Sequence, residues 1–147
     1  MPIEFKPREY HTVTPYLVVD GAAQLIEFMT TVLEGTELMR LPGPDGRVGH
    51  AEVRVGDSVV MIGDAPTPGD VMPAMLHLYV EDAEALYKRA IDHGAASVRE
   101  PTTEFYGDRM AGVKDPFGNK WYFATHVEDV APEEMARRAA ELAAAAM

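Results

Sequence analysis

Hydrophobic and polar positions follow two kinds of alternation along this chain, and the same order of patterns occurs twice. The stretch "TPYLVVDGAAQLIEFMTTVLEGTELMR" begins with a β-branched run, continues as an amphipathic segment and ends, after Gly35, in a short run. The later stretch "MLHLYVEDAEALYKRAIDHGAASVRE" has the same order, with Gly94 in the equivalent place. Each stretch therefore predicts a strand, a helix and a second strand.

Both predicted helices carry their apolar residues on one face. These residues recur at helical spacing: Leu25, Phe28, Met29, Val32 and Leu33 in the first, and Ala83, Leu86, Tyr87, Ala90 and Ile91 in the second. Asp82 is placed to cap the start of the second helix. Gly35 and Gly94 suit the left-handed residue that commonly ends a helix.

Two further strands are predicted after each of these units, because turn sequences divide the remaining chain. The turns are "PGPDGR" and "VGDS" in the first half and "FYGDR" and "KDPFGNK" in the second. Each half then reads βαβββ, over residues 14–64 and 75–126. We expect one α+β domain, with module one at about residues 10–65, a linker at 66–73 and module two at about 74–127. A single α+β sandwich without a repeat is the alternative.

The C-terminal segment "VEDVAPEEMARRAAELAAAAM" predicts a further helix at about residues 130–146. Asp129 can cap this helix, and Pro132 suits its first turn. A narrow apolar stripe runs along it, formed by Met135, Ala139, Leu142 and Ala146. The stripe can dock on the chain's own sheets or on a second subunit, and we expect a homodimer.

Composition narrows the classes of partner. The net charge of −11 disfavours binding to nucleic acid and to anionic membranes, and no basic stripe offsets it. The absence of cysteine excludes disulfides, thiolate nucleophiles and Cys-ligated zinc. The N-terminal residues do not have the pattern of a signal peptide, and no apolar run is long enough to span a membrane. We therefore expect a cytoplasmic protein whose partner is a small molecule or another protein.

Four stretches carry a resemblance to a known family: "LVVDGAAQLIEFM", "GRVGHAEVRVGDSVVMIGD", "LHLYVEDAEALYKRAIDHGA" and "GDRMAGVKDPFGNKWYFATHVED". Over about residues 10 to 128 the chain resembles the vicinal oxygen chelate superfamily of glyoxalases, bleomycin-resistance proteins and dioxygenases. The last two stretches are similar to its phosphonate-operon B-type branch. The resemblance implies that the sheets of two modules curl into an open mixed-sheet barrel around a central cavity.

The same resemblance implies a place for a divalent metal, held by His and Glu side chains on the first and fourth strands of each module. In this chain the corresponding residues are Thr14, Met61, Met75 and Tyr122. None of them is His, Glu or Asp, and the thioether of methionine suits soft Cu(I). We therefore predict no cofactor and a metal-free protein.

An alternative metal site remains open. In "HAEVRV" the apolar residues alternate with His50, Glu52 and Arg54, so these three are expected to face the cavity or its rim. His77 lies two residues beyond Met75 and shares its face. A relocated metal site would use His50, Glu52 and His77, and Glu52 with His77 are also the candidate catalytic residues for acid–base chemistry.

The alternation of the strands also predicts a set of ligand-binding residues that is rich in Tyr and Met and contains a few polar anchors. These residues are Tyr16, His50, Glu52, Met61, Met75, His77, Tyr79, Arg109 and Tyr122. The composition favours an aromatic or anionic small molecule, bound without chemistry. The alternatives are an enzyme of the lyase, isomerase or dioxygenase type, and a non-catalytic scaffold whose surface matters and whose cavity is vestigial. These residues can also simply fill a closed core.

Overall fold

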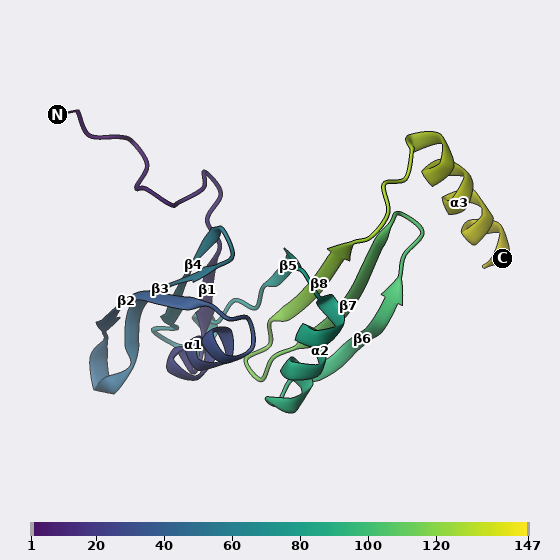
Figure 1. The fold of residues 1–147 in the computed structure, drawn as a ribbon. Coiled ribbons are helices and arrows are strands. Elements are labelled where there is room, and N and C mark those ends of the chain that lie inside the picture. Colours follow the sequence, from purple (N-terminus) through teal and green to yellow (C-terminus); the bar gives the residue numbers. More distant parts are fainter. Residues whose placement is uncertain (1, 147) are drawn as a thin grey trace. The chain divides into compact units, whose positions relative to one another are not determined.

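A computed structural model gives the fold and describes residues 2–146. The first half contains strand β1 (Tyr16–Val19), helix α1 (Ala22–Thr31) and strands β2 (Thr36–Pro42), β3 (Val48–Val55) and β4 (Ser58–Asp64). The second half contains strand β5 (Met75–Tyr79), helix α2 (Ala83–Asp92) and strands β6 (Ala96–Thr103), β7 (Asp108–Lys114) and β8 (Lys120–His126). Helix α3 (Pro132–Ala145) follows (Figure 1). The predicted α+β fold, with two βαβββ modules and a C-terminal helix, is confirmed.

Each half forms a mixed four-stranded sheet of its own. In the first sheet the order is β1-β4-β3-β2, with β1 parallel to β4 and the other pairs antiparallel. The second sheet repeats this arrangement with the order β5-β8-β7-β6. The chain divides into two compact units, Met1–Ala74 with Pro116–Asn119 and Met75–Asp115 with Lys120–Met147. The closing of the two sheets around a central cavity stays a prediction.

One face of each sheet is covered by the helix of its own unit. Because successive side chains of a strand point to opposite faces, alternate apolar residues form this buried layer. In the first unit it is formed by Leu17 and Val19 of β1, Val53 of β3 and Ile62 of β4, together with Leu25 and Met29 of α1, all fully buried. In the second unit Val113, Trp121 and Phe123 are likewise buried. The opposite face of each sheet carries the candidate site residues, with the exception of Arg109.

The start of helix α1 is held by a side chain from β4. Gly21, the residue before the helix, offers no side chain, and Asp64 Oδ1 instead accepts hydrogen bonds from the backbone N–H groups of Gly21 and Ala22 at 2.9 and 2.8 Å. The other carboxylate oxygen of Asp64 accepts from Val48 N–H at 2.8 Å. In the second unit Thr125, from the equivalent end of β8, accepts from the N–H of Ala83. The internal repeat therefore extends to the way in which each helix is joined to its sheet.

The predicted helix ends are partly confirmed. Asp82 accepts a hydrogen bond from the N–H of Ala85 and caps α2, and Gly94 has a positive φ of 97°. The prediction for Gly35 was wrong, because the left-handed residue after α1 is Glu34, with φ of 57°. Gly35 serves close packing instead, since a Cβ there would lie 2.8 Å from the side chain of Val53.

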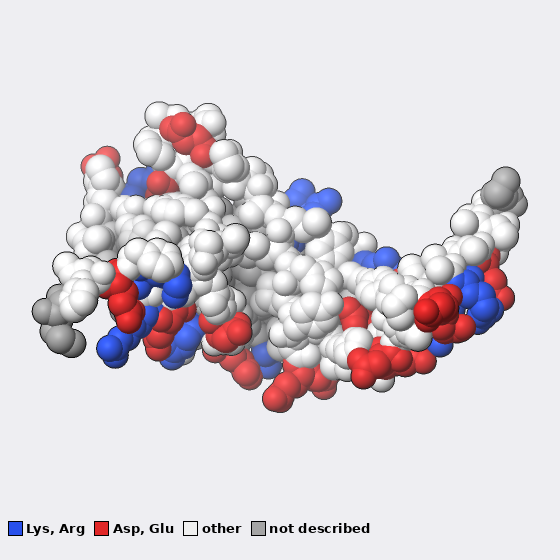
Figure 2. Space-filling view, turned by 90° about the horizontal axis from the view of Figure 1, so that it is seen from above, with Lys and Arg blue, Asp and Glu red and all other residues white. Residues whose placement is uncertain are grey.

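Helix α3 is joined to the second unit by polar contacts. Arg138 donates to the backbone oxygen of Phe105 and forms ion pairs with Glu128 and Glu134. Figure 2 shows acidic and basic groups side by side on this helix. Pro132 begins the helix as predicted, but the residue before it is Ala131 and not the predicted cap Asp129, which bonds to His126. Within residues 2–146, no helix combines the length and apolar character needed to cross a membrane.

Candidate functional site

The first candidate site is the face of the first sheet that α1 does not cover. It contains Tyr16 from β1, His50 and Glu52 from β3, and Met61 from β4. Tyr16 and Glu52 both lie opposite Met61 in the strand register. Residues directly opposite each other on neighbouring strands point to the same face, so the sheet brings these four side chains together. The alternation in the sequence predicts this shared face.

A chain of hydrogen bonds connects the polar side chains of this face. Tyr16 Oη lies 3.1 Å from His50 Nδ1, and His50 Nε2 lies 2.9 Å from Glu52 Oε2. Tyr10, from the segment before β1, donates its hydroxyl hydrogen to Glu52 Oε1. Tyr16 is 46% exposed, whereas the side chains of His50 and Glu52 are 25% and 15% exposed. A ligand on this face would therefore meet the Tyr16 end of the chain first.

The surroundings of Glu52 keep its carboxylate ionised. The hydrogen bond from Tyr10 holds the pKa of Glu52 below its usual range, and the bond and charge of His50 act in the same direction against the effect of burial. Burial and the carboxylate of Glu52 together raise the pKa of Tyr10 to about 12. Tyr10 is therefore a permanent hydrogen-bond donor to Glu52 at neutral pH.

Gly63 of β4 leaves room for the polar chain. A Cβ at this position would lie 3.2 Å from Tyr16 Oη and 3.0 Å from the backbone oxygen of Gly49. A side chain there would push the Tyr16 hydroxyl away from its position. Strand β2 adds an apolar border, because Met39 lies opposite Glu52 and Leu41 lies opposite His50, and they are 36% and 51% exposed.

The uncovered face of the second sheet differs in character. Met75 and Tyr79 of β5 are 67% and 68% exposed, with His77 between them and its ring 5.3 Å from that of Tyr79. Tyr122 of β8 lies opposite His77 and opposite Gly112 of β7. The ring of Tyr122 covers Gly112, since a Cβ at that glycine would approach the ring to 2.7 Å.

The two uncovered faces are related by register but not by chemistry. Gly112 lies opposite Tyr122 in the second sheet as Glu52 lies opposite Met61 in the first. The position that carries a carboxylate in the first unit therefore carries no side chain in the second, and a tyrosine ring fills the space. The hydrogen-bonded chain of Tyr16, His50 and Glu52 belongs to the first unit.

Arg109 does not lie with these residues, and the prediction of its orientation was wrong. In the register it lies opposite Thr125, whose hydroxyl accepts from the start of α2, so Arg109 points to the helix-covered face. It is 3.5 Å from Glu84 of α2 and donates to Thr103. Arg109 was predicted to face the same side of the sheet as Tyr122, which requires a register one residue different from the observed pairing of β7 with β8. A shift of one residue moves a side chain to the opposite face of a strand.

The second unit contains a polar cluster that was not predicted from the sequence. Asp108 is 3% exposed and accepts hydrogen bonds from Tyr79 Oη at 2.9 Å and from His126 Nδ1 at 2.8 Å. His126 Nε2 is 2.7 Å from Asp129 Oδ1. The available signal was the turn "FYGDR", which places Asp108 at the start of β7 next to the end of β8.

His126 is hydrogen-bonded through both of its ring nitrogens, and this gives a testable pH dependence of stability. The hydrogen bonds to Asp108 and Asp129 raise the pKa of His126 above its ordinary value of 6.5. Because the folded-state pKa is raised, the stabilisation is fully present below pH 6.5 and is lost as the pH rises through the folded-state pKa. NMR titration should show this raised value, and Asp129→Asn should lower it. A His126 pKa unchanged by that substitution would contradict the pairing.

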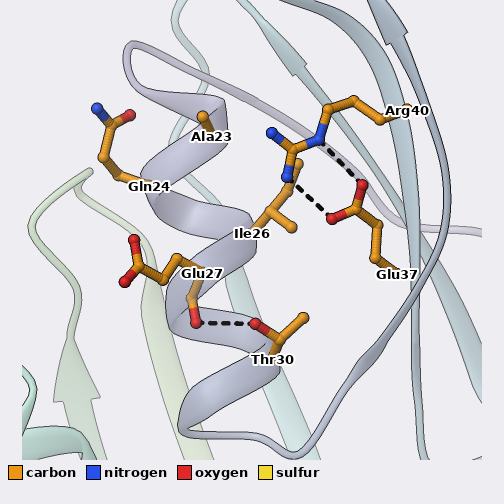
Figure 3. Close-up of a pocket in the computed structure, with 7 residues that line it drawn as sticks. All are labelled: Ala23, Gln24, Ile26, Glu27, Thr30, Glu37 and Arg40. Carbon is orange, nitrogen blue, oxygen red and sulfur yellow. Dashed lines mark hydrogen bonds and ion pairs between the residues drawn. The ribbon is translucent and has the colours of Figure 1, made fainter.

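A groove between α1 and β2 is a second place for a ligand in the first unit. Its volume is about 390 Å³, and it is lined by Ala23, Gln24, Ile26, Glu27, Thr30, Glu37 and Arg40 (Figure 3). Two hydrogen bonds of 3.0 and 2.9 Å tie the guanidinium of Arg40 to the carboxylate of Glu37. Glu37 neutralises Arg40, and Glu27 leaves the lining of this groove with a net negative charge.

The three residues of the alternative metal site do not belong to one unit. His50 and Glu52 contact each other in the first unit, whereas His77 belongs to the second. Among residues 2–146, neither unit by itself brings together three or more His, Asp or Glu side chains in an arrangement that could hold a metal ion. The catalytic candidates Glu52 and His77 are likewise divided between the units.

Comparison with known proteins gives a family match and relatives. The model of the Glyoxalase/Bleomycin resistance protein/Dioxygenase superfamily matches residues 10–123. An uncharacterized Mycobacterium bovis protein, Mb0911c, is 36% identical over 134 residues, which cover 84% of this chain and 88% of that protein.

Two solved structures show the same fold. TioX from Micromonospora sp. ML1 is similar with a TM-score of 0.68 and 21% identity, covering 80% of this chain and 99% of that one. A PhnB protein from Bacillus cereus has a TM-score of 0.64 and 14% identity, with coverages of 78% and 99%.

Proposed function

Because the chain belongs to the glyoxalase/bleomycin resistance protein/dioxygenase superfamily, we propose that it binds a small aromatic molecule on the uncovered sheet face of its first unit. The observation that supports this proposal is the hydrogen-bonded chain from Tyr16 through His50 to Glu52. Apolar side chains accompany it, with Met61 of β4 between Tyr16 and Glu52 and Leu41 of β2 opposite His50. Small-molecule sites commonly combine such apolar walls with a few oriented polar groups.

The proposed binding does not use a divalent metal at the four positions that the family suggests. Thr14 Oγ1 bonds to the backbone oxygen of His11, and the ring of Tyr122 covers Gly112. Met61 and Met75 offer only thioethers, which are poor ligands for hard or borderline divalent ions. These four side chains do not fit a divalent metal, and we assign no step to one.

Each side chain of the face has a distinct part in the proposed recognition. The half-exposed ring of Tyr16 offers a flat surface for an aromatic ligand, and its hydroxyl offers an oriented hydrogen bond. Met61 lies between Tyr16 and Glu52 in the register, and its flexible thioether can adapt to the shape of the ligand.

Acid–base catalysis is a second candidate function, and the contact between His50 and Glu52 favours it. The sequence predicts Glu52 and His77 for this role, but the carboxylate of Glu52 contacts His50 at 2.9 Å. A histidine oriented by a carboxylate is a common general base. Turnover of a bound compound would support this function over simple binding.

The test is a thermal-shift screen of aromatic phenols and carboxylates, followed by calorimetric titration of the best ligand. Met61→Trp should abolish binding, because the indole would fill the space between Tyr16 and Glu52. Tyr16→Phe should keep the ring but lose the hydrogen bond, which weakens binding by about 0.5–1.5 kcal/mol. Prior treatment with a chelator should leave the affinity unchanged.

Two control variants test where the ligand binds. Arg40→Ala alters the groove between α1 and β2, and Arg109→Ala alters the helix-covered face of the second sheet. Both should bind the ligand as the parent does. Binding that survives Met61→Trp but is lost in either control would place the site elsewhere and contradict the proposal. A screen without any ligand would favour the scaffold alternative.

A further inference from the structure

The uncovered face of the first sheet is also contacted by a segment that lies outside its four strands. Residues 7–10 form a turn before β1, with a backbone hydrogen bond of 3.4 Å from the N–H of Tyr10 to the oxygen of Pro7. The ammonium group of Lys6 donates to the backbone oxygen of Tyr10. This segment, the purple stretch that leads into β1 in Figure 1, precedes the βαβββ repeat. We call residues 7–10 the N-terminal turn.

The N-terminal turn is held against β3 by its last two side chains. Tyr10 donates its hydroxyl hydrogen to Glu52 Oε1, and Glu9 pairs with Arg54 at 3.4 Å. Glu52 and Arg54 are two residues apart on β3, so both point to the uncovered face. The turn therefore lies beyond Glu52 on this face, whereas Tyr16 lies at the opposite end of the polar chain, next to His50.

The contacts of the N-terminal turn allow it to open. Glu9 has φ of 71°, a left-handed conformation that is unfavourable for a residue with a Cβ. The side chains of Glu9 and Arg54 are 60% and 36% exposed, and ion pairs between such groups contribute little. The hydrogen bond from Tyr10 to Glu52 is then the main attachment of the turn. Opening would leave the buried layer on the other face of the sheet undisturbed.

We propose that the N-terminal turn is a movable wall that closes on the aromatic molecule bound at this face, with Tyr10 as the side chain that contacts it. This inference rests on the proposed function. The polar chain ends in a tyrosine on each side, Tyr16 from β1 and Tyr10 from the turn. Met61 lies between Tyr16 and Glu52 in the register, so an aromatic ring over Met61 has one tyrosine at each end. Aromatic rings attract each other in edge-to-face and offset contacts.

Closure of the turn and binding of the ligand are then linked. A ligand that binds the closed state more tightly lowers the population of the open state by the same factor. Trypsin can measure that population, because the bond between Arg8 and Glu9 lies inside the turn and the protease needs an extended chain. When opening and closing are fast, the cleavage rate follows the population of the open state. Lys6 precedes Pro7, and trypsin does not cut before proline.

The first arm of the test uses the full chain without a ligand, with mass spectrometry to measure the rate of tryptic cleavage after Arg8. Tyr10→Phe should raise this rate about three- to tenfold, because it removes one hydrogen bond. Tyr87→Phe is the matched control, since the hydroxyl of Tyr87 also donates to a side chain, Ser97 of the second unit. This control should be cleaved after Arg8 as fast as the parent. Equal rates in the parent and Tyr10→Phe would overturn the inference.

The second arm adds a probe, either 2-naphthol or the compound of the thermal-shift screen that binds most tightly. A saturating probe should slow cleavage after Arg8 in the parent by about tenfold. Tyr10→Ala should bind the probe about tenfold more weakly and gain no protection at Arg8, because no ring remains to contact the ligand. Cleavage of an unrelated peptide in the same mixture checks that the probe does not inhibit trypsin, and thermal unfolding checks that each variant is folded.

The outcomes distinguish this inference from the proposed function. If a probe binds the parent but not Met61→Trp, and cleavage after Arg8 is unchanged, the movable wall is overturned and the proposed binding stands. An unchanged affinity of folded Tyr10→Ala overturns the wall equally. If no compound of the screen binds, both are overturned.

Discussion

Replacing Asp64 with alanine is expected to lower the free energy of unfolding by about 3–5 kcal/mol, because each unsatisfied buried donor costs about 1–3 kcal/mol. The carboxylate receives three backbone N–H groups, from Gly21, Ala22 and Val48, and its side chain is 8% exposed. Its removal leaves the start of α1 and the start of β3 without partners. Denaturant unfolding measures the loss, and Asp64→Asn should lose less because one amide oxygen remains to accept.

Asp20→Ala is the matched control for this prediction. Asp20 is a neighbouring carboxylate whose side chain is 84% exposed and whose one ion pair, to Arg47, is 3.4 Å long. Its removal should change stability by less than about 0.5 kcal/mol, as expected for an exposed pair. Equal losses of stability in Asp64→Ala and Asp20→Ala would contradict the prediction that the hydrogen bonds to Asp64 stabilise the fold.

The contribution of Asp64 should also depend on pH. Burial opposes its ionisation, but the backbone hydrogen bonds from Ala22, Val48 and Gly21 and the charge of Arg47 hold its pKa below the ordinary 3.8. Because the folded-state pKa is depressed, the stabilisation is present above pH 3.8 and is lost as the pH falls through the folded-state pKa. The difference between parent and Asp64→Ala should shrink accordingly in acid.

A Gly107→Ala variant is expected to lose about 2–5 kcal/mol, the sum of two costs. Gly107 has φ of 100°, where a residue with a Cβ loses about 1–2 kcal/mol. The added methyl group would also collide with the backbone oxygen of Glu128, and overpacking costs about 1–3 kcal/mol more. The segment before α3 donates from Val127 and Glu128 to the oxygen of Gly107, so this segment should loosen first.

Gly94→Ala separates the two costs. Gly94 has nearly the same φ, 97°, but a Cβ there would meet nothing within 4 Å. Only the backbone cost of about 1–2 kcal/mol should appear. Limited proteolysis should cut Gly107→Ala near residues 127–131 faster than it cuts Gly94→Ala. Similar stability and similar cleavage in the two variants would contradict the proposed collision.

Period-two alternation was sufficient to predict which residues of β1, β3 and β4 share a face. Tyr16, His50, Glu52 and Met61 lie together because each of their strands has one continuous apolar side that must be buried. The same reasoning failed for Arg109, because β7 is apolar on both faces over residues 110–113 and gives no alternation to follow. Only the pairing of β7 with β8 determines which face of the sheet Arg109 points to.

The contacts between elements distant in sequence could not be predicted. Asp64 caps a helix that begins 42 residues earlier, and His126 meets Asp108 across a turn. Both residues have the polar character typical of surface positions at strand ends. The partners of Asp64 depend on the parallel pairing of β1 with β4, and the partner of His126 depends on the antiparallel register of β7 with β8. A local sequence pattern predicts neither of these pairings.

The ring of Tyr122 above Gly112 limits how the second half of this chain can evolve. A glutamate at position 112 would match Glu52 of the first half, but its Cβ would lie 2.7 Å from that ring. A smaller side chain at position 122 must therefore come before any acidic residue at 112. The two halves share an architecture, but a single substitution cannot give the second half the carboxylate of the first, and the order of mutations is constrained.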